Sequence, residues 1–559
     1  MEKTNQASVR KEAPISKQAM SAGFILLVLG LAQIINAYDT TAMNVAVSRI
    51  VQDLHTTVTG VQAALTTYSL VMAAFMIIGS KLGDIWGWKR TFTLGVILYG
   101  IGALITSLSP DLGLMITGWS LLEGIGSALM IPAIFSMIAI FFPEGKARVR
   151  GYAVIGMAAA AGAALGPLIC GFLTTFVSWR ASFAMEVLVV IIVVLLSRKL
   201  AVPKVEGVRP RLDLLGAVLS ALGLAFVVMG ILQASVYGWL TARKAFIIGN
   251  TQLIPQGGIS PVIVFVLIGL VILVLFVLWQ RQRVRAKKQP LIDLAIFKLR
   301  AASIGLPVII VQMFMQAGLL FVVPLFLQIG LGFNAFQAGL TLLPLTIALI
   351  LVATQVSKVM ARFTPKLAVS AGLLFTSIGI LVVGLTMSSS STSISVMPGL
   401  IIVGIGLGLT TAPLLNLVQS SVPISEQGDI SGLNRAFSNL GGALGTAVAG
   451  AVLIAALISG LSFGINQSAV LPAADKPTLE QAAEKDAQTV SDVELTAYLK
   501  TKDEPQPIEN EMVKINAQAR DKSLRDAVTA IGVLGLIGFL LSFFLPGPML
   551  PERKPRGSA

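Results

Sequence analysis

Charged residues are scarce in this chain of 559 residues, because Asp, Glu, Lys and Arg together make up only 12%. A soluble globular protein carries about 25%. Cysteine and histidine each occur once, as Cys170 and His55, which excludes an internal disulfide and a Cys/His metal cluster. No Gly-Lys-Ser or Gly-Lys-Thr phosphate loop is present, and we expect no cofactor, no metal and no enzyme activity. Hydrophobic residues make up 55% and the mean hydropathy is +0.85, so the composition indicates a membrane protein.

Fourteen apolar runs are long enough, or nearly so, to cross a bilayer, which takes about 20 residues. They predict an all-α polytopic membrane protein with 14 transmembrane helices. The first run follows four basic residues, as in a signal peptide, but it is about 26 residues long and lacks a small-residue cleavage site, so we expect an uncleaved helix. The expected spans are 22–47, 59–80, 92–109, 113–142, 151–177, 182–197, 214–236, 260–280, 302–330, 337–357, 367–387, 396–422, 431–460 and 526–546.

The basic residues predict the orientation of these spans. With the N-terminus in the cytoplasm, 29 of the 41 Lys and Arg residues fall on the cytoplasmic side, including Arg435 at the start of the span 431–460. The positive-inside rule therefore predicts a multi-pass protein of the cytoplasmic (inner) membrane with both termini in the cytoplasm. The net charge of +14 is then a topological signal, so we expect no nucleic-acid partner and no Lys or Arg deep in a span.

One hydrophilic segment, residues 461–523, interrupts the apolar pattern, and the topology places it outside the membrane. Two stretches that begin at Thr478 and Ser491 have the Ser/Thr-x-x-Glu/Gln pattern of helix starts. We expect a helical hairpin or a partly ordered lid here. A solvated tether without a role in transport explains the composition equally simply.

Two connections resemble each other and indicate an internal duplication. The segments 81–90 and 358–366 align at Lys81 with Lys358 and at Lys89 with Lys366. The two segments are eight spans apart. Two six-helix repeats with two inserted helices (7 and 8) between them would explain this spacing. Duplicated halves are typical of transporters. The expected parts are a cytoplasmic tail (residues 1–21), an N-terminal half (22–200), a linker that contains the seventh and eighth helices (201–290), a C-terminal half (291–460 and 524–546), an outside loop (461–523) and a second cytoplasmic tail (547–559).

A set of short motifs resembles, in order and spacing, the fourteen-helix drug–proton antiporters of the major facilitator superfamily. The resemblance covers essentially the whole membrane part and implies a multidrug efflux function. Its pieces are Asp39 to Asn44, Gly83-Asp84 with Gly87 and Lys89-Arg90, Glu123 to Pro132, Gly162 to Gly171, Trp179-Arg180, Pro324 to Gln328, Gln337 to Leu340, and Gly441 to Gly445.

Two acidic residues lie deep in the predicted spans. Asp39 lies about 8 residues, or about 12 Å, from the outer end of the first span, and Glu123 lies at a similar depth in the fourth. Intramembrane acids are costly unless they face a cavity or a partner, and a shared proton, two held protons or a bound cationic substrate would each relieve that cost. We expect Asp39 and Glu123 to form the proton or cation coupling site. The simpler alternatives are that Asp39 bonds Asn36 or Thr40, and that Glu123 stays protonated and only packs.

The chain departs from the family pattern near Glu123, since the family usually has Arg where Ser120 stands and Gln where Glu123 stands. A third acid, Glu186, is only about 4 residues into its predicted span. It is either a further coupling residue or, more simply, an interface residue that reaches the headgroup region.

Two further motifs carry roles that the resemblance implies. In the loop after the second span, Asp84, Gly87, Lys89 and Arg90 would form the conformational switch, with Asp84 locking one state; topogenic charge alone explains the basic residues. In the fifth span, the antiporter motif would bend or pack the helix and so favour export over import. Its residues are Gly162, Gly166, Pro167 and Gly171. Small residues four apart also predict close helix packing.

Polar and aromatic side chains within the spans are candidates for the substrate cavity, although lipid-facing or core positions explain single aromatics as well. They are Gln33, Asn36, Tyr68, Gln312, Phe314 and Gln316. A mixed apolar surface with few polar groups suits amphipathic organic compounds. The expected function is proton-driven export of hydrophobic or cationic organic compounds by alternating access. The alternative is export of an endogenous lipid, siderophore or metabolite. The expected partners are a small organic substrate, protons and the lipid bilayer, and the protein is expected to be a monomer.

Overall fold

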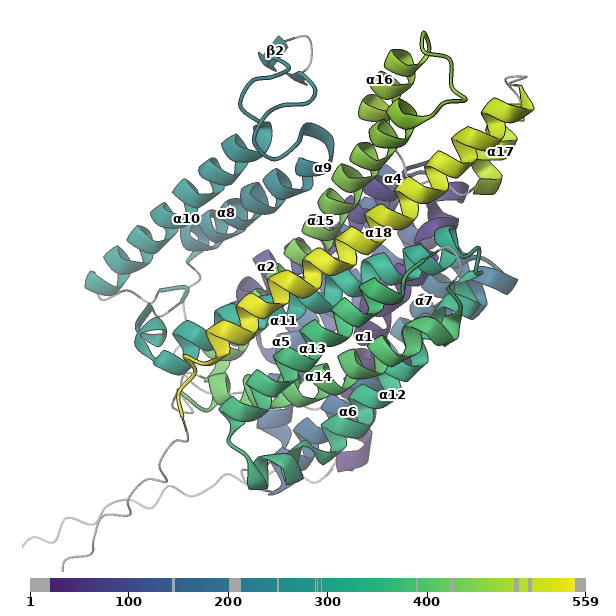
Figure 1. Ribbon diagram of the computed structural model, residues 1–559. Helices are drawn as coiled ribbons and strands as arrows, with labels where there is room; N and C mark the ends of the chain where they lie inside the picture. The colour runs from purple at the N-terminus through teal and green to yellow at the C-terminus, as the bar shows by residue number, and fades with distance from the viewer. Residues whose placement is uncertain are drawn as a thin grey trace, which may run out of the picture.

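A computed structural model describes residues 21–547, apart from 143–145, 201–212, 249–250, 287, 289, 293, 389–390, 423–426, 487–491 and 501–504. The described part is a bundle of long helices (Figure 1), and 14 of them are long and apolar enough to cross a membrane. This confirms the predicted fold class of a 14-helix all-α membrane protein. The end of the bundle that carries α16 and α17, at the top of Figure 1, is called the upper end; the lower end is where α1 begins and α18 ends.

The first helix group comprises the elements α1 to α7, which pack mainly against one another. Helices begin where a side chain can bind the free N–H groups of the first turn: Ser21, Thr57, Asp111 and Ser178 each accept such a bond. The bounds are α1 Ala22–Asp53, α2 Val58–Trp86, α3 Trp88–Ser107, α4 Leu112–Met115 with a π-helix Ile116–Glu123 and α5 Gly124–Phe141, α6 Lys146–Phe176 and α7 Trp179–Ser197.

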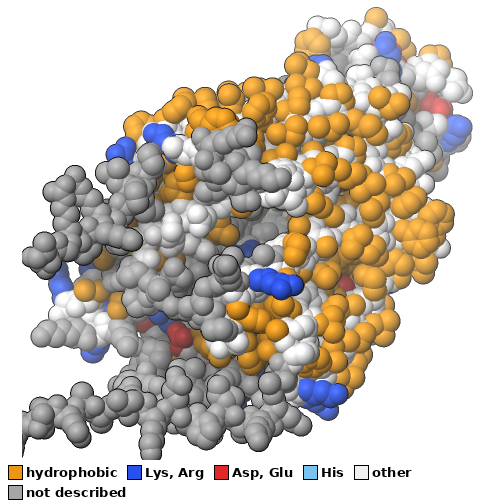
Figure 2. All heavy atoms as spheres, turned by 90° about the horizontal axis from the view of Figure 1, so that it is seen from below, with side chains coloured by type: hydrophobic (Ala, Val, Ile, Leu, Met, Phe, Trp, Pro, Cys, Tyr) orange, Lys and Arg blue, Asp and Glu red, His pale blue; other side chains and the backbone are white. Residues whose placement is uncertain are grey.

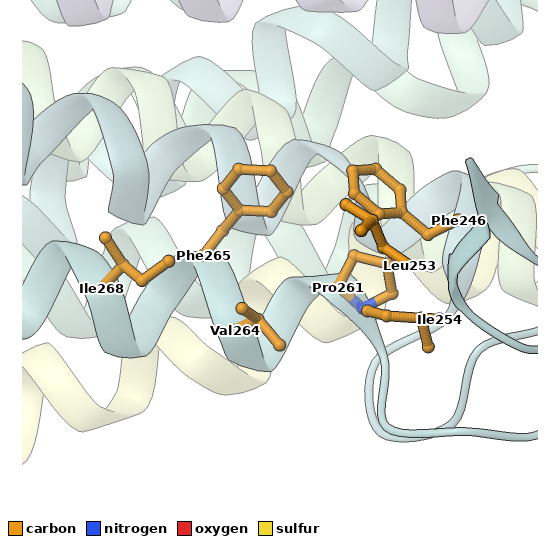
Figure 3. Close-up of a pocket in the computed structure, with 7 residues that line it drawn as sticks. All are labelled: Phe246, Leu253, Ile254, Pro261, Val264, Phe265 and Ile268. Carbon is orange, nitrogen blue, oxygen red and sulfur yellow. The ribbon is translucent and has the colours of Figure 1, made fainter. Parts of the chain in front are cut away.

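A helical hairpin stands to one side of the bundle (Figure 1). It consists of α8 Leu214–Leu232, a short α9 Ala234–Tyr237, strands β1 Phe246–Ile248 and β2 Thr251–Ile254, and α10 Pro261–Arg285. The strands pair antiparallel. Asp213, 3% exposed, ties the two helices together, because it accepts hydrogen bonds from Trp279 and Gln280 and pairs with Arg283 at 3.5 Å. An apolar cavity of about 360 Å³ lies between β1–β2 and α10 (Figure 3).

The second helix group comprises α11 to α18. Its bounds are α11 Arg300–Leu325 with a π-helix Phe326–Gly330, α12 Ala335–Arg362, α13 Pro365–Thr386, α14 Ser393–Gln419, α15 Gln427–Gln467, α16 Lys476–Asp486, α17 Asp492–Lys500 and α18 Gln506–Ser542. The helices α15 and α18 pack along each other and project beyond the bundle at the upper end, where α16 packs on α15 and α17 on α18 (Figure 1).

The two groups meet mainly through α2 with α15 and through α6 with α12. Gln62 of α2, 1% exposed, donates to the carbonyl groups of Thr446 (3.0 Å) and Ala447 (3.1 Å) in α15. The backbone N–H of Phe336 in α12 donates to the Thr175 hydroxyl of α6 at 3.1 Å. These contacts lie near the upper ends of α2, α6 and α12 and midway along α15, which projects beyond the bundle, so the two groups are in contact in the upper part of the bundle.

The hydrophilic segment 461–523 differs from its expected outline. Its first and last residues belong to α15 and α18, which continue well past the apolar runs, because a run of apolar residues marks the bilayer and not the end of the helix. The two helix-start patterns correspond to α16, which begins at Lys476, and α17, which begins at Asp492. Two short helices are therefore present in the described part of this segment, and α16 packs on α15 while α17 packs on α18.

Arg435 and Arg520 lie within long helices of the described chain. Arg435 is near the start of α15 and its side chain is partly buried. Arg520 of α18 is 1% exposed and is 3.5 Å from Asp521, in the part of the helix that precedes the apolar run 526–546. The expectation that no Lys or Arg lies deep in a span stays a prediction.

The outer surface agrees with a bilayer environment. In the view of Figure 2 hydrophobic side chains cover most of the described surface, and charged side chains are few. The helix α10 is the extreme case, with only 17% of its apolar window buried and large exposed residues such as Leu267 and Val271. Exposed apolar side chains of this kind are stable only against lipid or another protein.

Candidate functional site

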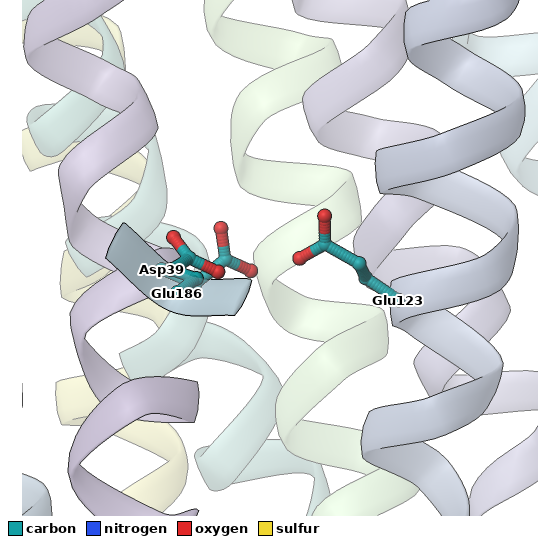
Figure 4. Close-up of side chains that lie close together, drawn as sticks. All are labelled: Asp39, Glu123 and Glu186. Atoms are coloured by element: carbon teal, nitrogen blue, oxygen red, sulfur yellow. The ribbon is translucent and has the colours of Figure 1, made fainter. Parts of the chain in front are cut away.

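Three carboxylates meet inside the first helix group. Asp39 of α1, Glu123 at the end of the π-helix and Glu186 of α7 each offer one oxygen, and these oxygens lie within 4.8 Å of one another. Figure 4 shows Asp39 and Glu186 side by side with Glu123 pointing toward them. Their exposed fractions are 1%, 0% and 1%. The structure thus brings together the two acids that the sequence placed at one depth, and it adds the third.

The interface interpretation of Glu186 is wrong. The helix α7 begins at Trp179, three residues before the predicted span, so Glu186 lies two turns into the helix and not one. Its side chain points into the group, where the Tyr99 hydroxyl donates to Glu186 Oε2 at 2.6 Å. A side chain that is 1% exposed does not reach the headgroups.

Each carboxylate of this acidic cluster is held by one donor. Trp119 Nε1 donates to Asp39 Oδ1 at 2.7 Å, Tyr99 donates to Glu186, and the Thr106 hydroxyl donates weakly to Glu123 Oε1 at 3.4 Å. The second oxygens, Asp39 Oδ2 and Glu123 Oε2, are buried and have no hydrogen-bond partner. Asn36 and Thr40, the alternative partners considered for Asp39, bond instead to Ser127 and to the Ala37 carbonyl.

No Lys or Arg among the residues that the structure describes forms an ion pair with this acidic cluster. Three ionised carboxylates in a low-dielectric interior would repel one another and would lack compensation. The two unpartnered oxygens can be satisfied by protons, or by one small cation.

The π-helix and Gly102 of α3 position Glu123. π-turns are frequent at functional sites because the extra residue per turn displaces a side chain from the regular helix face. Across from it, a Cβ on Gly102 of α3 would lie 2.6 Å from Glu123 Cγ and 2.6 Å from the Gly118 carbonyl. Only a glycine at position 102 therefore leaves room for the Glu123 side chain.

Aromatic side chains pack beside the acidic cluster. The Tyr68 and Trp119 rings stack with centroids 4.9 Å apart and planes 3° from parallel. The Tyr68 hydroxyl is 3.3 Å from Ser127 Oγ, and the Tyr38 hydroxyl bonds Ser182. Of these residues only Tyr68 was among the cavity candidates. Trp119 and Tyr99 were missed because nothing in their local sequence separates them from ordinary apolar positions.

The other cavity candidates are placed as follows. Gln33 is 3% exposed and its Oε1 has no hydrogen-bond partner. Gln312 is buried and donates to the Thr411 hydroxyl at 2.6 Å, while Phe314 and Gln316 of α11 are half-buried. The backbone of Phe314 lies against Gly445 of α15. Their contact with substrate remains a prediction.

The antiporter-motif glycines lie at two helix crossings. A side chain on Gly162 would overlap the Ile34 backbone of α1, and one on Gly166 would overlap the Thr41 side chain. A Cβ on Gly171 would lie 2.6 Å from the Ala335 carbonyl of α12, and one on Gly339 would overlap the Pro167 carbonyl. The close-packing prediction is confirmed, and α6 thereby joins α1 in its own group to α12 in the other.

The predicted switch residues lie at the lower end. Gly87 follows α2 with φ +93°, a conformation that favours glycine. Lys89 donates to the carbonyls of Arg198 (3.1 Å) and Leu200 beyond the end of α7. Asp84 and Arg90 are exposed. Their role in switching remains a prediction.

Fourteen helices long and apolar enough to cross a membrane, with a buried acidic cluster inside the first group, are typical of a polytopic transport protein. The chain belongs to the Major Facilitator Superfamily, whose family model matches residues 29–446. At the level of the family it is therefore a membrane transporter and not an enzyme.

The relatives are bacterial transport and resistance proteins. The chain is 29% identical over 470 residues to the probable actinorhodin transporter of Streptomyces coelicolor, which covers 81% of this chain and 77% of the relative. It is 27% identical over 437 residues to the lincomycin resistance protein LmrB of Listeria innocua, with 78% and 85% covered. Among solved structures, a bacterial homolog of the human lysosomal transporter Spinster matches 95% of this chain and 98% of its own with a TM-score of 0.61 at 16% identity, which shows a common fold.

Proposed function

We propose that this protein is a secondary active exporter of hydrophobic or cationic organic compounds, driven by proton antiport. The observation that carries the proposal is the buried acidic cluster with two unpartnered carboxylate oxygens and no described cationic partner. A site of this kind gains stability by taking up protons and loses it when they leave. Proton uptake from one side and release to the other can therefore be linked to a change of conformation.

The two helix groups are proposed to be the two halves that move in alternating access. Their contacts near the upper end, through Gln62 and through the α6–α12 crossing, close the path there. We propose that the upper end faces the outside of the cytoplasmic membrane and that both termini are cytoplasmic. The closed upper end then corresponds to a state that loads substrate from the inside, and the α8–α10 hairpin is an insertion between the halves. The protein is proposed to act as a monomer.

The deciding experiment is a substrate panel in inverted vesicles, with the acidic lumen representing the outside. Uptake of dyes and antibiotics is measured with a pH gradient, with the gradient collapsed, and with a Na⁺ gradient in its place. Vesicles without the protein are the control. Uptake that follows the pH gradient is the expected result. Uptake that ignores the pH gradient would overturn proton antiport, and uptake that follows Na⁺ would assign the acidic cluster to that cation.

The names of two relatives favour a second candidate. One is called an actinorhodin transporter and another, 29% identical over 436 residues, a cephamycin export protein from Amycolatopsis lactamdurans. Each name refers to one organic compound and not to many. Export of a single endogenous metabolite, lipid or siderophore would appear in the panel as transport of none of the drugs, together with accumulation of one compound in cells that lack the protein.

A further inference from the structure

Arg435 occupies an unusual position between the two helix groups. It lies in α15, and its guanidinium carbon is 5.3 Å from the ring centroid of Phe135 in α5. Tyr152 of α6 stacks on the same Phe135, with the two ring centroids 6.1 Å apart and the rings 25° from parallel. Three helices from both groups thus build a cationic–aromatic site within the membrane span.

The edge of this guanidinium has no acceptor among the residues that the structure describes. A guanidinium carries five N–H donors in its plane, and a ring satisfies only its face. Arg180 shows what a structural arginine does here: it lies 4.5 Å from the Trp179 ring, yet it also donates to the Ser109 carbonyl at 2.9 Å and pairs with Asp53 at 3.5 Å. Arg435 has the ring contact without those acceptors, although its side chain is partly buried.

A second donor lies on the same face of α15. Arg435, Asn439, Gly442 and Thr446 follow one another at helical spacing. This face is turned to the first helix group, because a Cβ on Gly442 would lie 3.7 Å from Ser69 and the Thr446 carbonyl accepts from Gln62. Asn439 Nδ2 on this face is buried and has no hydrogen-bond partner. The Arg435 guanidinium and Asn439 Nδ2 are therefore two hydrogen-bond donors without described acceptors, one helical turn apart on the face of α15 that meets the first helix group.

The site is well separated from the acidic cluster. Phe135 comes twelve residues after Glu123 in the same continuous span, which is about 18 Å nearer the lower end at 1.5 Å per residue. A substrate group that binds Arg435 is thus not in contact with the carboxylates.

We propose that Arg435 and Asn439 bind an acidic group, a carboxylate or a similar oxyanion, of an amphipathic aromatic compound whose ring packs on Phe135. The two donors complement such a group, and arginine matches the two oxygens of a carboxylate. The inference rests on the proposed export function and extends its substrates to compounds that carry a negative group beside an apolar, or even cationic, body.

The test uses two probes that differ only at the acidic group: rhodamine B, with a free carboxylate, and its ethyl ester. Binding to the purified full-length protein in neutral-lipid nanodiscs is measured by fluorescence. We expect the wild type to prefer the acid. Arg435→Gln should weaken binding of the acid about tenfold or more and leave the ester within about twofold, since one charge-assisted hydrogen-bonded contact is lost. Arg435→Lys should keep part of the preference.

Arg281→Gln is the matched control. It removes the same charge, but Arg281 is exposed at the lower end of α10, away from the proposed site, so the preference for the acid should persist. Retained binding of the ester shows that each variant is folded. An equal loss of acid and ester in both Arg435 variants, or a wild type without preference for the acid, would overturn the proposal. If added phosphatidylglycerol displaces the acid from the wild type and not from Arg435→Gln, the site belongs to a lipid headgroup and the cargo proposal is overturned.

Failure of the export function is distinguishable from failure of this inference. In the vesicle assay, absence of uptake of both dyes together with normal binding of the acid contradicts export and leaves the binding site intact. Uptake of the ester alone, with no binding of the acid, supports the export function and contradicts the anion-binding site.

Discussion

The interiors of the two helix groups differ in charge. The first group holds three buried carboxylates, two of which have an unpartnered oxygen. The second group is polar without acids at its described centre: Gln312 bonds Thr411, Asn434 is 1% exposed with neither amide atom bonded, and Arg435 faces the first group. We infer that the first group performs the ion chemistry, and that the second group contributes neutral and basic contacts for the substrate. A neutral amide costs less to bury than a charge, so only the first group changes its energy strongly with protonation.

The sharpest test of this division removes the acids one at a time. Asp39→Asn and Glu123→Gln should each lower proton-driven transport by about 100-fold or more, because neither amide can carry the exchanged proton. Gln312→Leu in the second group should change the apparent substrate affinity while proton coupling persists. Uptake in inverted vesicles with and without a pH gradient is the measurement, and full activity of both acid variants would refute the division.

A smaller effect is expected from the packing around Glu123. Gly102→Ala would press a methyl group against Glu123 Cγ, 2.6 Å away. Overpacking costs about 1–3 kcal/mol, and we expect a loss of coupling in addition to the loss of stability. Gly379→Ala in α13 is the matched control, because its Cβ would lie 2.6 Å from the Val403 amide nitrogen, with no carboxylate beside it. The ratio of transport with and without the pH gradient, measured beside thermal stability, should change only in Gly102→Ala.

The donor to Asp39 should have a more moderate influence. Trp119→Phe keeps the ring stacked on Tyr68 but removes the N–H that bonds Asp39 at 2.7 Å. A hydrogen bond of this kind contributes about 0.5–1.5 kcal/mol, or up to about 3 if Asp39 is charged. In the wild type this donor stabilises the ionised form of Asp39. Without it the protonated form persists to higher pH, so the pH midpoint of transport should shift upward. An unchanged pH profile would show that Asp39 does not limit the coupling.

The smallest effect is expected at the upper end. The helices α16 and α17 pack only on the projecting parts of α15 and α18 within the described residues. Replacing residues 472–504 by a short Gly-Ser linker should therefore change drug uptake by less than about twofold, as for any solvated surface segment. A strong loss of uptake in a protein that still inserts normally would make this segment a lid of the transport path.

The sequence was informative where a property depends on one helix at a time. Apolar run lengths predicted fourteen spans, and counting residues along the first and fourth spans placed Asp39 and Glu123 at one depth. The same counting misjudged Glu186, because α7 begins at Trp179 and not at the first strongly apolar residue.

Composition and periodicity thus determined the membrane class, the number of helices and the depth of two acids, because hydrophobic transfer energy acts on each segment independently. Only the tertiary structure decided that a third carboxylate joins them, that Trp119 and Tyr99 hold two of the three, and that Arg435 meets Phe135 between the groups. These contacts join residues such as Asp39 and Trp119 that are 80 positions apart. No local pattern encodes them, because they depend on how α1, α3, α5 and α7 pack around one another.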